Sequence, residues 1–159
     1  RPSERFATLE MRIADSCTTL EDSLSIAALF RCLLRMLWRL KRQNQRWRIY
    51  ARMLVDENRW RAQRYGTDLG LVDFGRGAIV PYGELLEEIL ALIEPDARYF
   101  GCEAEVRHAR RIVARGTSAH RQLAIFDAAR ATGASRAEAL SAVVDWLIAE
   151  TVRGLAKGC

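Results

Sequence analysis

Glu10 and Arg12 are an acidic and a basic side chain whose spacing would let them act together. They are two positions apart, and Thr8 stands two positions before Glu10. On a β-strand, residues two apart leave the same face, so these three side chains would lie next to one another. A carboxylate placed there can ligate a hard divalent cation, and a guanidinium can fork onto a carboxylate or phosphate. The alternative is an exposed ion pair on a solvated sheet face, which contributes little.

The element that must position this pair is a strand predicted over residues 6–15. Its apolar residues alternate with polar ones, so that one face is apolar and the other carries Glu10 and Arg12. The backbone groups of a single strand need hydrogen-bonding neighbours. We therefore expect the neighbouring strands to come from an N-terminal portion absent from this chain or from a partner chain. The opening at Arg1 rather than Met fits a piece of a larger gene product.

A second polar group is predicted on a helix over residues 46–65, which follows a short polar break at 43–45. Asn58, Arg61 and Tyr65 recur at helical spacing, and Arg64 lies beside them, so a polar stripe follows one side of this helix. Asn58 could contact a ligand, or it could bond to a nearby backbone group, as helix asparagines often do. The residues alone leave both roles open.

The remaining elements are mostly helices, and together they indicate a single α+β unit over residues 1–159. Thr18 and Glu21 have capping-box spacing before an apolar helix at 24–40, and Ser135 and Glu138 repeat that spacing later. A glycine-rich turn predicts a small hairpin from 71–74 to 78–80. The other predicted helices cover residues 81–93, ended by Glu94-Pro95; 96–115, with a break at Gly101; 118–132; and 136–155.

Composition excludes several classes of protein. Half of the 159 residues are apolar and 28% are charged, which is ordinary for a folded domain. No window approaches the roughly 18 consecutive apolar residues of a membrane helix. The four cysteines form no CxxC pair or Cys/His cluster, which argues against a structural zinc site or a disulfide scaffold. A reducing cytoplasm fits this pattern best, and we expect no membrane association.

The net charge of +5 is distributed unevenly. Residues 31–64 hold eleven basic side chains against two acidic ones, so this segment carries +9 and the remainder −4. Such a segment can be a pair of helices with solvated basic faces, or a surface for phosphates or nucleic acid. The apolar character of residues 24–40 argues against a helix lying free in a groove of DNA, and the basic residues do not gather on one short recognition helix.

A longer set of motifs is more specific than any of these features. In order along the chain, the motifs are Arg1-Pro2-Ser3-x-Arg5, Thr8-Leu9-Glu10-x-Arg12, Asp15, Glu57-Asn58-x-Trp60-Arg61-Ala62-x-Arg64-Tyr65-Gly66, Leu71-Val72-Asp73-Phe74-Gly75, Val80-Pro81 and Gly116-Thr117-x-x-x-Arg121-Gln122-Leu123. This arrangement resembles the C-terminal half of the YbdK-like carboxylate-amine ligases, also described as glutamate-cysteine ligase type 2. The resemblance extends to about Glu150.

The resemblance implies a helix-dominated C-terminal half of a glutamine-synthetase-like antiparallel-sheet fold. It also implies an ATP- and Mg²⁺-dependent ligase that joins the γ-carboxylate of glutamate to an amine, nominally cysteine, through an acyl phosphate. By the same similarity Glu10 would bind the metal and Arg12 the substrate carboxylate or the transferring phosphoryl group. The other residues that the resemblance suggests are Arg61 for catalysis and Arg1, Arg5, Asn58 and Arg64 for nucleotide binding.

One position departs from the family pattern, because His120 stands where an aspartate is expected before the Arg121-Gln122 pair. The metal-binding strands expected upstream are not in this chain either, so we expect the isolated chain to be inactive without its N-terminal half. Two alternatives remain: a helical nucleic-acid-binding module, and a structural fragment that keeps the fold without the activity. For the ligase, the expected partners are glutamate and an amine, the missing N-terminal half and, as an option, a second copy of the chain; we expect no specific nucleic acid.

Overall fold

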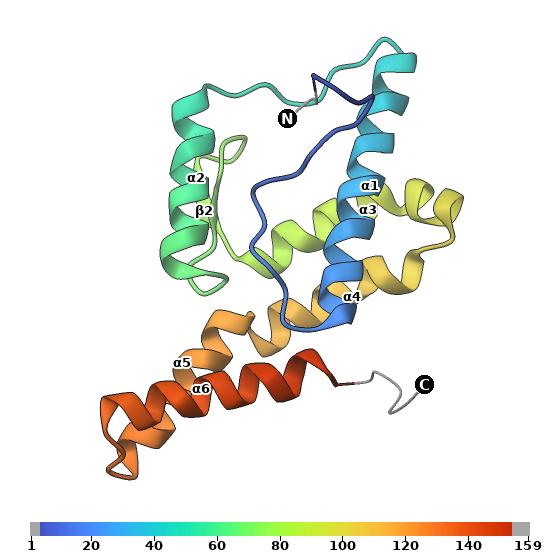
Figure 1. The fold of residues 1–159 in the computed structure, drawn as a ribbon. Coiled ribbons are helices and arrows are strands. Elements are labelled where there is room, and N and C mark those ends of the chain that lie inside the picture. The colour runs from blue at the N-terminus through green and yellow to red at the C-terminus, as the bar shows by residue number, and fades with distance from the viewer. Residues whose placement is uncertain (1–3, 154–159) are drawn as a thin grey trace, which may run out of the picture.

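The computed structural model describes residues 4–153, and its largest packed part consists of three helices. These are α1 (Leu20–Arg42), α3 (Tyr82–Phe100) and α4 (Glu103–Arg115), which pack against one another and which we call the three-helix unit (Figure 1). Their shared core contains Ala28, Cys32, Met36, Leu90, Ile93, Ala97 and Val106. Helix α1 begins after Thr19, whose hydroxyl accepts from the Asp22 amide, one residue later than the predicted cap at Thr18.

Helix α3 corrects a prediction, because it does not end at Glu94-Pro95. It continues through Pro95 to Phe100 and ends at Gly101, which adopts the left-handed conformation with φ 62°. A proline inside a helix removes one hydrogen bond and costs about 3 kcal/mol. Here Ile93 and Ala97 are buried on the turns around Pro95, and the buried Asp96 is paired with Arg35 and Arg39, so packing and ion pairs favour continuing the helix. The predicted break at Gly101 is confirmed.

The second part of the molecule is α2 (Arg52–Tyr65) with a two-stranded antiparallel hairpin, β1 (Leu71–Asp73) and β2 (Ala78–Val80). The predicted hairpin is confirmed, and its register pairs Leu71 with Val80 and Asp73 with Ala78. Helix α2 starts at Arg52 rather than residue 46, and residues 45–51 form a connection without regular secondary structure. No residue of α2 is buried, so this helix is held by few contacts within the described residues.

Helices α5 (Ser118–Ala131) and α6 (Arg136–Thr151) form a helical hairpin below the three-helix unit in Figure 1. Both begin with capping boxes: Thr117 pairs with His120, and Ser135 pairs with Glu138 as predicted. Helix α6 ends at Thr151, a few residues before the predicted end at 155. Glu150, in its last turn, is almost fully buried and binds Arg121 of α5 at 2.9 Å.

The strand predicted over residues 6–15 is not present in the described residues. The segment is irregular except for a single bridge at Leu9, and it runs between α2 and α1 in the view of Figure 1. Phe6, Leu9 and Ile13 are 66%, 52% and 72% exposed. The described part of the chain supplies no sheet beside this segment, and an extended backbone without neighbours does not form a stable strand.

The fold class agrees with the prediction at a coarse level, since helices dominate and the sheet within residues 4–153 is small and antiparallel. None of the helices described here combines the length and apolar character required to cross a bilayer.

Candidate functional site

Asn58 and Arg61 lie together, and both attach the hairpin to α2. The Asn58 side-chain amide donates to the Val72 carbonyl at 2.8 Å, and its carbonyl accepts from the Val72 amide at 2.7 Å. It thus replaces the backbone of a neighbouring strand along the free edge of β1. Arg61 donates to the carbonyls of Gly70 at 3.3 Å and Leu69 at 3.1 Å. The backbone-bonding role that the sequence left open for Asn58 is therefore present.

Gly70 explains why the chain can turn so closely into β1. Its φ is +66°, a conformation that side chains disfavour, and a Cβ atom there would lie 2.2 Å from the Val80 carbonyl oxygen. The close approach of Gly70 to Val80 places β2 against the loop at residues 69–70, to which Arg61 donates its hydrogen bonds. The loop, Arg61 and Asn58 therefore form one locally fixed corner.

A cavity of about 220 Å³ lies at this corner, between α2, the hairpin, α3 and the 45–51 connection. Its wall includes Asn58, Asp73 and Arg48. A hydrogen bond from Arg48 to Glu88 at 2.7 Å raises the pKa of the guanidinium. The backbone amides of Arg76 and Gly75 donate to the Asp73 carboxylate and lower its pKa. The cavity therefore carries fixed charges of both signs.

Glu10 and Arg12 do form an ion pair, with 2.8 Å between Oε2 and Nη2, but both side chains are more than half exposed. Within residues 4–153, no group of three or more His, Cys, Asp or Glu side chains is arranged to hold a metal ion. Magnesium prefers six oxygen ligands, whereas this pair supplies one carboxylate beside a positive charge. The described residues alone therefore do not make a complete Mg²⁺ site.

The other predicted nucleotide-binding residues are found in different places. The Arg5 guanidinium lies 5.9 Å from the centre of the Phe6 ring, in the N-terminal segment. The Arg64 guanidinium lies 6.0 Å from the Tyr65 ring centre, on α2. Arg1 is outside the described residues. The structure thus groups Asn58, Arg61 and Arg64 on one helix and leaves Glu10, Arg12 and Arg5 on the irregular segment.

His120 connects two of the motifs noted in the sequence. Its Nδ1 accepts from the Thr117 amide at 3.0 Å, and its Nε2 lies 3.2 Å from a carboxylate oxygen of Asp68. A Cβ atom at Gly66 would come within 2.7 Å of the ring. The imidazole therefore joins the end of α2 to the start of α5. In place of the aspartate expected there, His120 acts as a helix cap and a packing contact.

The arginines of α1 have partners that sequence reasoning missed. Arg35 and Arg39 bind the fully buried Asp96 at 2.5 and 3.0 Å. The Arg31 guanidinium stacks on Phe100, 3.8 Å from its centre, and Arg35 stacks on Tyr99 at 3.7 Å. These partners come about sixty positions later in the chain, so no local pattern could indicate them. Part of the +9 segment therefore serves helix packing, which weakens the nucleic-acid alternative.

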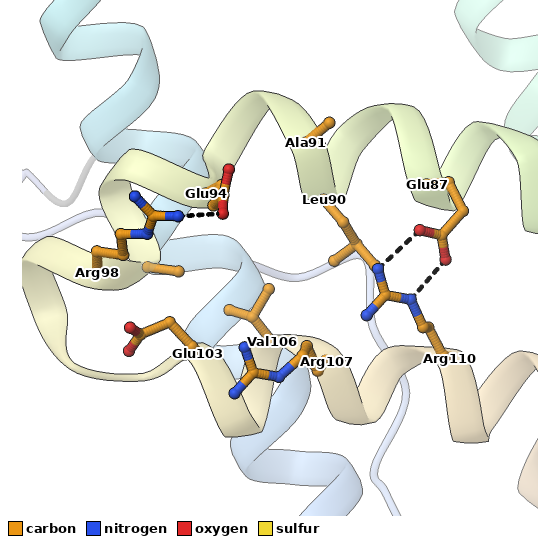
Figure 2. Close-up of a pocket in the computed structure, with 10 residues that line it drawn as sticks. Glu87, Leu90, Ala91, Glu94, Arg98, Glu103, Val106, Arg107 and Arg110 are labelled. Carbon is orange, nitrogen blue, oxygen red and sulfur yellow. Dashed lines mark hydrogen bonds and ion pairs between the residues drawn. The ribbon is translucent and has the colours of Figure 1, made fainter.

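A further groove of about 350 Å³ runs between α3 and α4 (Figure 2). Leu90 and Val106 lie at its base, and charged side chains line its sides. Glu87 accepts two hydrogen bonds from Arg110, at 2.6 and 2.7 Å, and the dashed lines of Figure 2 also join Glu94 to Arg98. None of the predicted site residues lines this groove, so it is separate from the corner formed by α2 and the hairpin.

Comparison with known proteins identifies the family to which the chain belongs. The profile of glutamate-cysteine ligase family 2 (GCS2) matches residues 1–145, so the chain belongs to this family. A relative from Rhodospirillum rubrum is 70% identical over 98% of this chain, and one from Jannaschia sp. is 52% identical over 93%. A Paracoccus denitrificans relative is 48% identical over 98%. All three are provisionally named glutamate–cysteine ligase 2.

The chain spans about 40% of the length of these curated relatives. No solved structure matches the chain at a significant level. The family assignment therefore comes from sequence, and the glutamine-synthetase-like fold stays a prediction.

Proposed function

We propose that the complete protein is an ATP-dependent carboxylate-amine ligase that forms an amide on the γ-carboxylate of glutamate. The observation that carries this proposal is the family membership over residues 1–145, together with the 70% identity to a relative provisionally named glutamate–cysteine ligase 2. Cysteine is the nominal amine acceptor by that name. Because similar sites accept different amines, the acceptor is the least constrained part of the proposal.

The proposed reaction has two steps. An oxygen of the γ-carboxylate attacks the γ-phosphorus of ATP, the bond from phosphorus to the ADP oxygen breaks, and an acyl phosphate forms. The amine nitrogen then attacks the acyl carbon, phosphate leaves with the C–O electron pair, and the nitrogen loses a proton. Catalysis of phosphoryl transfer depends mainly on positioning and on positive charge around the transferring group.

The chain's residues have distinct proposed roles in this reaction. Arg12 would bind the substrate carboxylate or the transferring phosphoryl group, while Arg1, Arg5 and Arg64 would neutralise nucleotide phosphates. Glu10 would contribute one ligand to Mg²⁺, which neutralises phosphate charge when bound. The remaining metal ligands would come from the part of the complete protein outside this chain.

The roles of Arg61 and Asn58 are more constrained, because hydrogen bonds to the loop before β1 and to Val72 already engage them. We propose that Asn58 acts by fixing the hairpin and that any contact to the nucleotide is made from this anchored position. Arg61 would contribute its charge to the reaction while it remains bound to the same loop. Preorganised groups of this kind stabilise a transition state without reorganising during the reaction.

The test uses the complete protein and this chain in parallel. Each is incubated with ATP, Mg²⁺, glutamate and a panel of amines that includes cysteine, and phosphate release and the amide product are measured. We expect product from the complete protein only. Failure of the complete protein with every amine would refute the ligase proposal. Robust turnover by the 159-residue chain alone would refute the view that it holds an incomplete site.

A further inference from the structure

Two cysteines distant in sequence meet inside the three-helix unit. Cys32, in the middle of α1, is fully buried, and Cys102, in the turn between α3 and α4, is partly exposed. Their Sγ atoms are 3.6 Å apart although 70 positions separate them in the chain. This distance is van der Waals contact, about 1.5 Å longer than an S–S bond. A small adjustment of the two side chains would therefore bring the sulfurs to bonding distance.

The surrounding contacts hold this pair in place. Cys32 belongs to the core cluster of the three-helix unit, and Cys102 packs against that cluster. Near the pair the Arg31 guanidinium stacks on Phe100, and Asp96 binds two arginines of α1. The relative position of α1 and the α3–α4 turn is thus fixed by contacts that do not involve sulfur. Groups held together in this way react as an intramolecular pair.

We propose that Cys32 and Cys102 form a redox-active dithiol, which low-molecular-weight disulfides such as oxidised glutathione convert to an intramolecular disulfide. The proposal does not depend on the ligase function. Cys102, the more accessible thiol, attacks one sulfur of oxidised glutathione, the S–S bond breaks, and one glutathione leaves. Cys32 then attacks the Cys102 sulfur of this mixed disulfide and expels the second glutathione. Two cysteine thiols are oxidised, one glutathione disulfide is reduced, and the two thiol protons end on the glutathiones.

The environment of Cys32 makes its attack the slower of the two steps. Burial raises the pKa of the Cys32 thiol to about 12, and the hydrogen bond with Cys102 acts in the same direction. The nearby Asp96 carboxylate raises this pKa further, whereas Arg31 lowers it. Little thiolate is therefore present at neutral pH, and we expect the mixed disulfide on Cys102 to accumulate before the ring closes.

The experiment uses the purified chain with oxidised glutathione as the probe, followed by alkylation, digestion and mass spectrometry. The chain has four cysteines. After oxidation we expect one cross-linked peptide that joins Cys32 to Cys102, while Cys17 and Cys159 are recovered as alkylated thiols. Closing this long loop should raise Tm by about 5–15 °C, and dithiothreitol should reverse the rise. The Cys102→Ser variant should show neither the cross-link nor the rise, and its Cys32 should stay unmodified because it is buried.

Cys17→Ser is the matched control, since Cys17 lies outside the three-helix unit and should not affect the result. Two outcomes would overturn the proposal. One is glutathione on Cys17 or Cys159 with no Cys32–Cys102 peptide at any time. The other is an equal Tm rise in Cys102→Ser, which would place the oxidation elsewhere.

Discussion

The three-helix unit and the part that carries the family motifs are stabilised in different ways. In the three-helix unit, Cys32, Ile93 and Asp96 are completely buried, and Asp96 on α3 binds Arg35 and Arg39 of α1. Helix α2 buries no residue, and its hairpin is held largely by Asn58 and Arg61. The three-helix unit is therefore held by a buried core and by ion pairs to a buried carboxylate, whereas the part that carries the motifs is held by a few individual hydrogen bonds.

The largest effect is expected at the buried charge of the scaffold. Asp96→Ala removes the carboxylate that binds Arg35 and Arg39 and leaves both guanidiniums without it, so we expect a loss of about 3 kcal/mol in unfolding free energy. Glu94→Ala is the control, because Glu94 pairs with Arg98 at the surface and should change stability by no more than about 0.5 kcal/mol. Denaturant unfolding of both variants measures these free energies. A loss in Asp96→Ala as small as that in Glu94→Ala would show that the three-helix unit does not rely on Asp96.

The next effect is expected in the hairpin, at Gly70. Gly70→Ala adds a Cβ atom against the Val80 carbonyl at a positive φ, so we expect a loss of about 2–3 kcal/mol. Gly77→Ala has the same φ of +66° but open space around the new atom, and should cost about 1 kcal/mol. Amide hydrogen exchange in β1 and β2 locates the effect. Equal losses of unfolding free energy in Gly70→Ala and Gly77→Ala would contradict the proposed clash with the Val80 carbonyl.

A smaller loss is expected at Asn58. Asn58→Ala leaves the amide and carbonyl of Val72 without their partner, at a cost of about 1–2 kcal/mol, and should speed hydrogen exchange at Val72 selectively. Gln63→Ala, at an exposed position on the same helix, provides the control. Unchanged protection of the Val72 amide would rule out the anchoring role.

The smallest effect is a pH dependence at Asp73. Its folded-state pKa lies below the ordinary value of 3.8 because backbone amides donate to the carboxylate. Its contribution to stability is therefore present above pH 3.8 and is lost as the pH falls through the folded-state pKa. In Asp73→Asn this loss disappears, so the Tm difference between wild type and variant should shrink below pH 3.8. Measuring Tm of the wild type and of Asp73→Asn from pH 2 to 6 checks this prediction. A Tm difference that stays constant over this range would contradict a lowered pKa of Asp73.

Local patterns in the sequence predicted much of this structure. The hairpin, the Ser135 capping box and the break at Gly101 depend on neighbouring residues, and each is confirmed. Predictions of features that depend on residues far away in the sequence were less accurate. Helix α3 continues through Pro95 because of burial against other helices.

The candidate site shows the same limit. The strand at residues 6–15 is absent where no neighbouring sheet is described. The spacing of Asn58 and Arg61 indicated a shared polar stripe, but not that both would bind the chain entering β1. The pairing of Arg35 and Arg39 with Asp96 could not be predicted from the sequence either, because Asp96 follows these arginines by about sixty residues.

We propose that the exposed N-terminal segment serves the reaction rather than the stability of the fold. The substitution Glu10→Gln in the complete protein tests this role. This change keeps the shape of the side chain and removes the charge that would attract a cation. We expect single-turnover ligation to fall by about 10²-fold or more, because one preorganised electrostatic contact is removed, while Tm stays unchanged. Wild-type turnover by Glu10→Gln across a magnesium titration would contradict it.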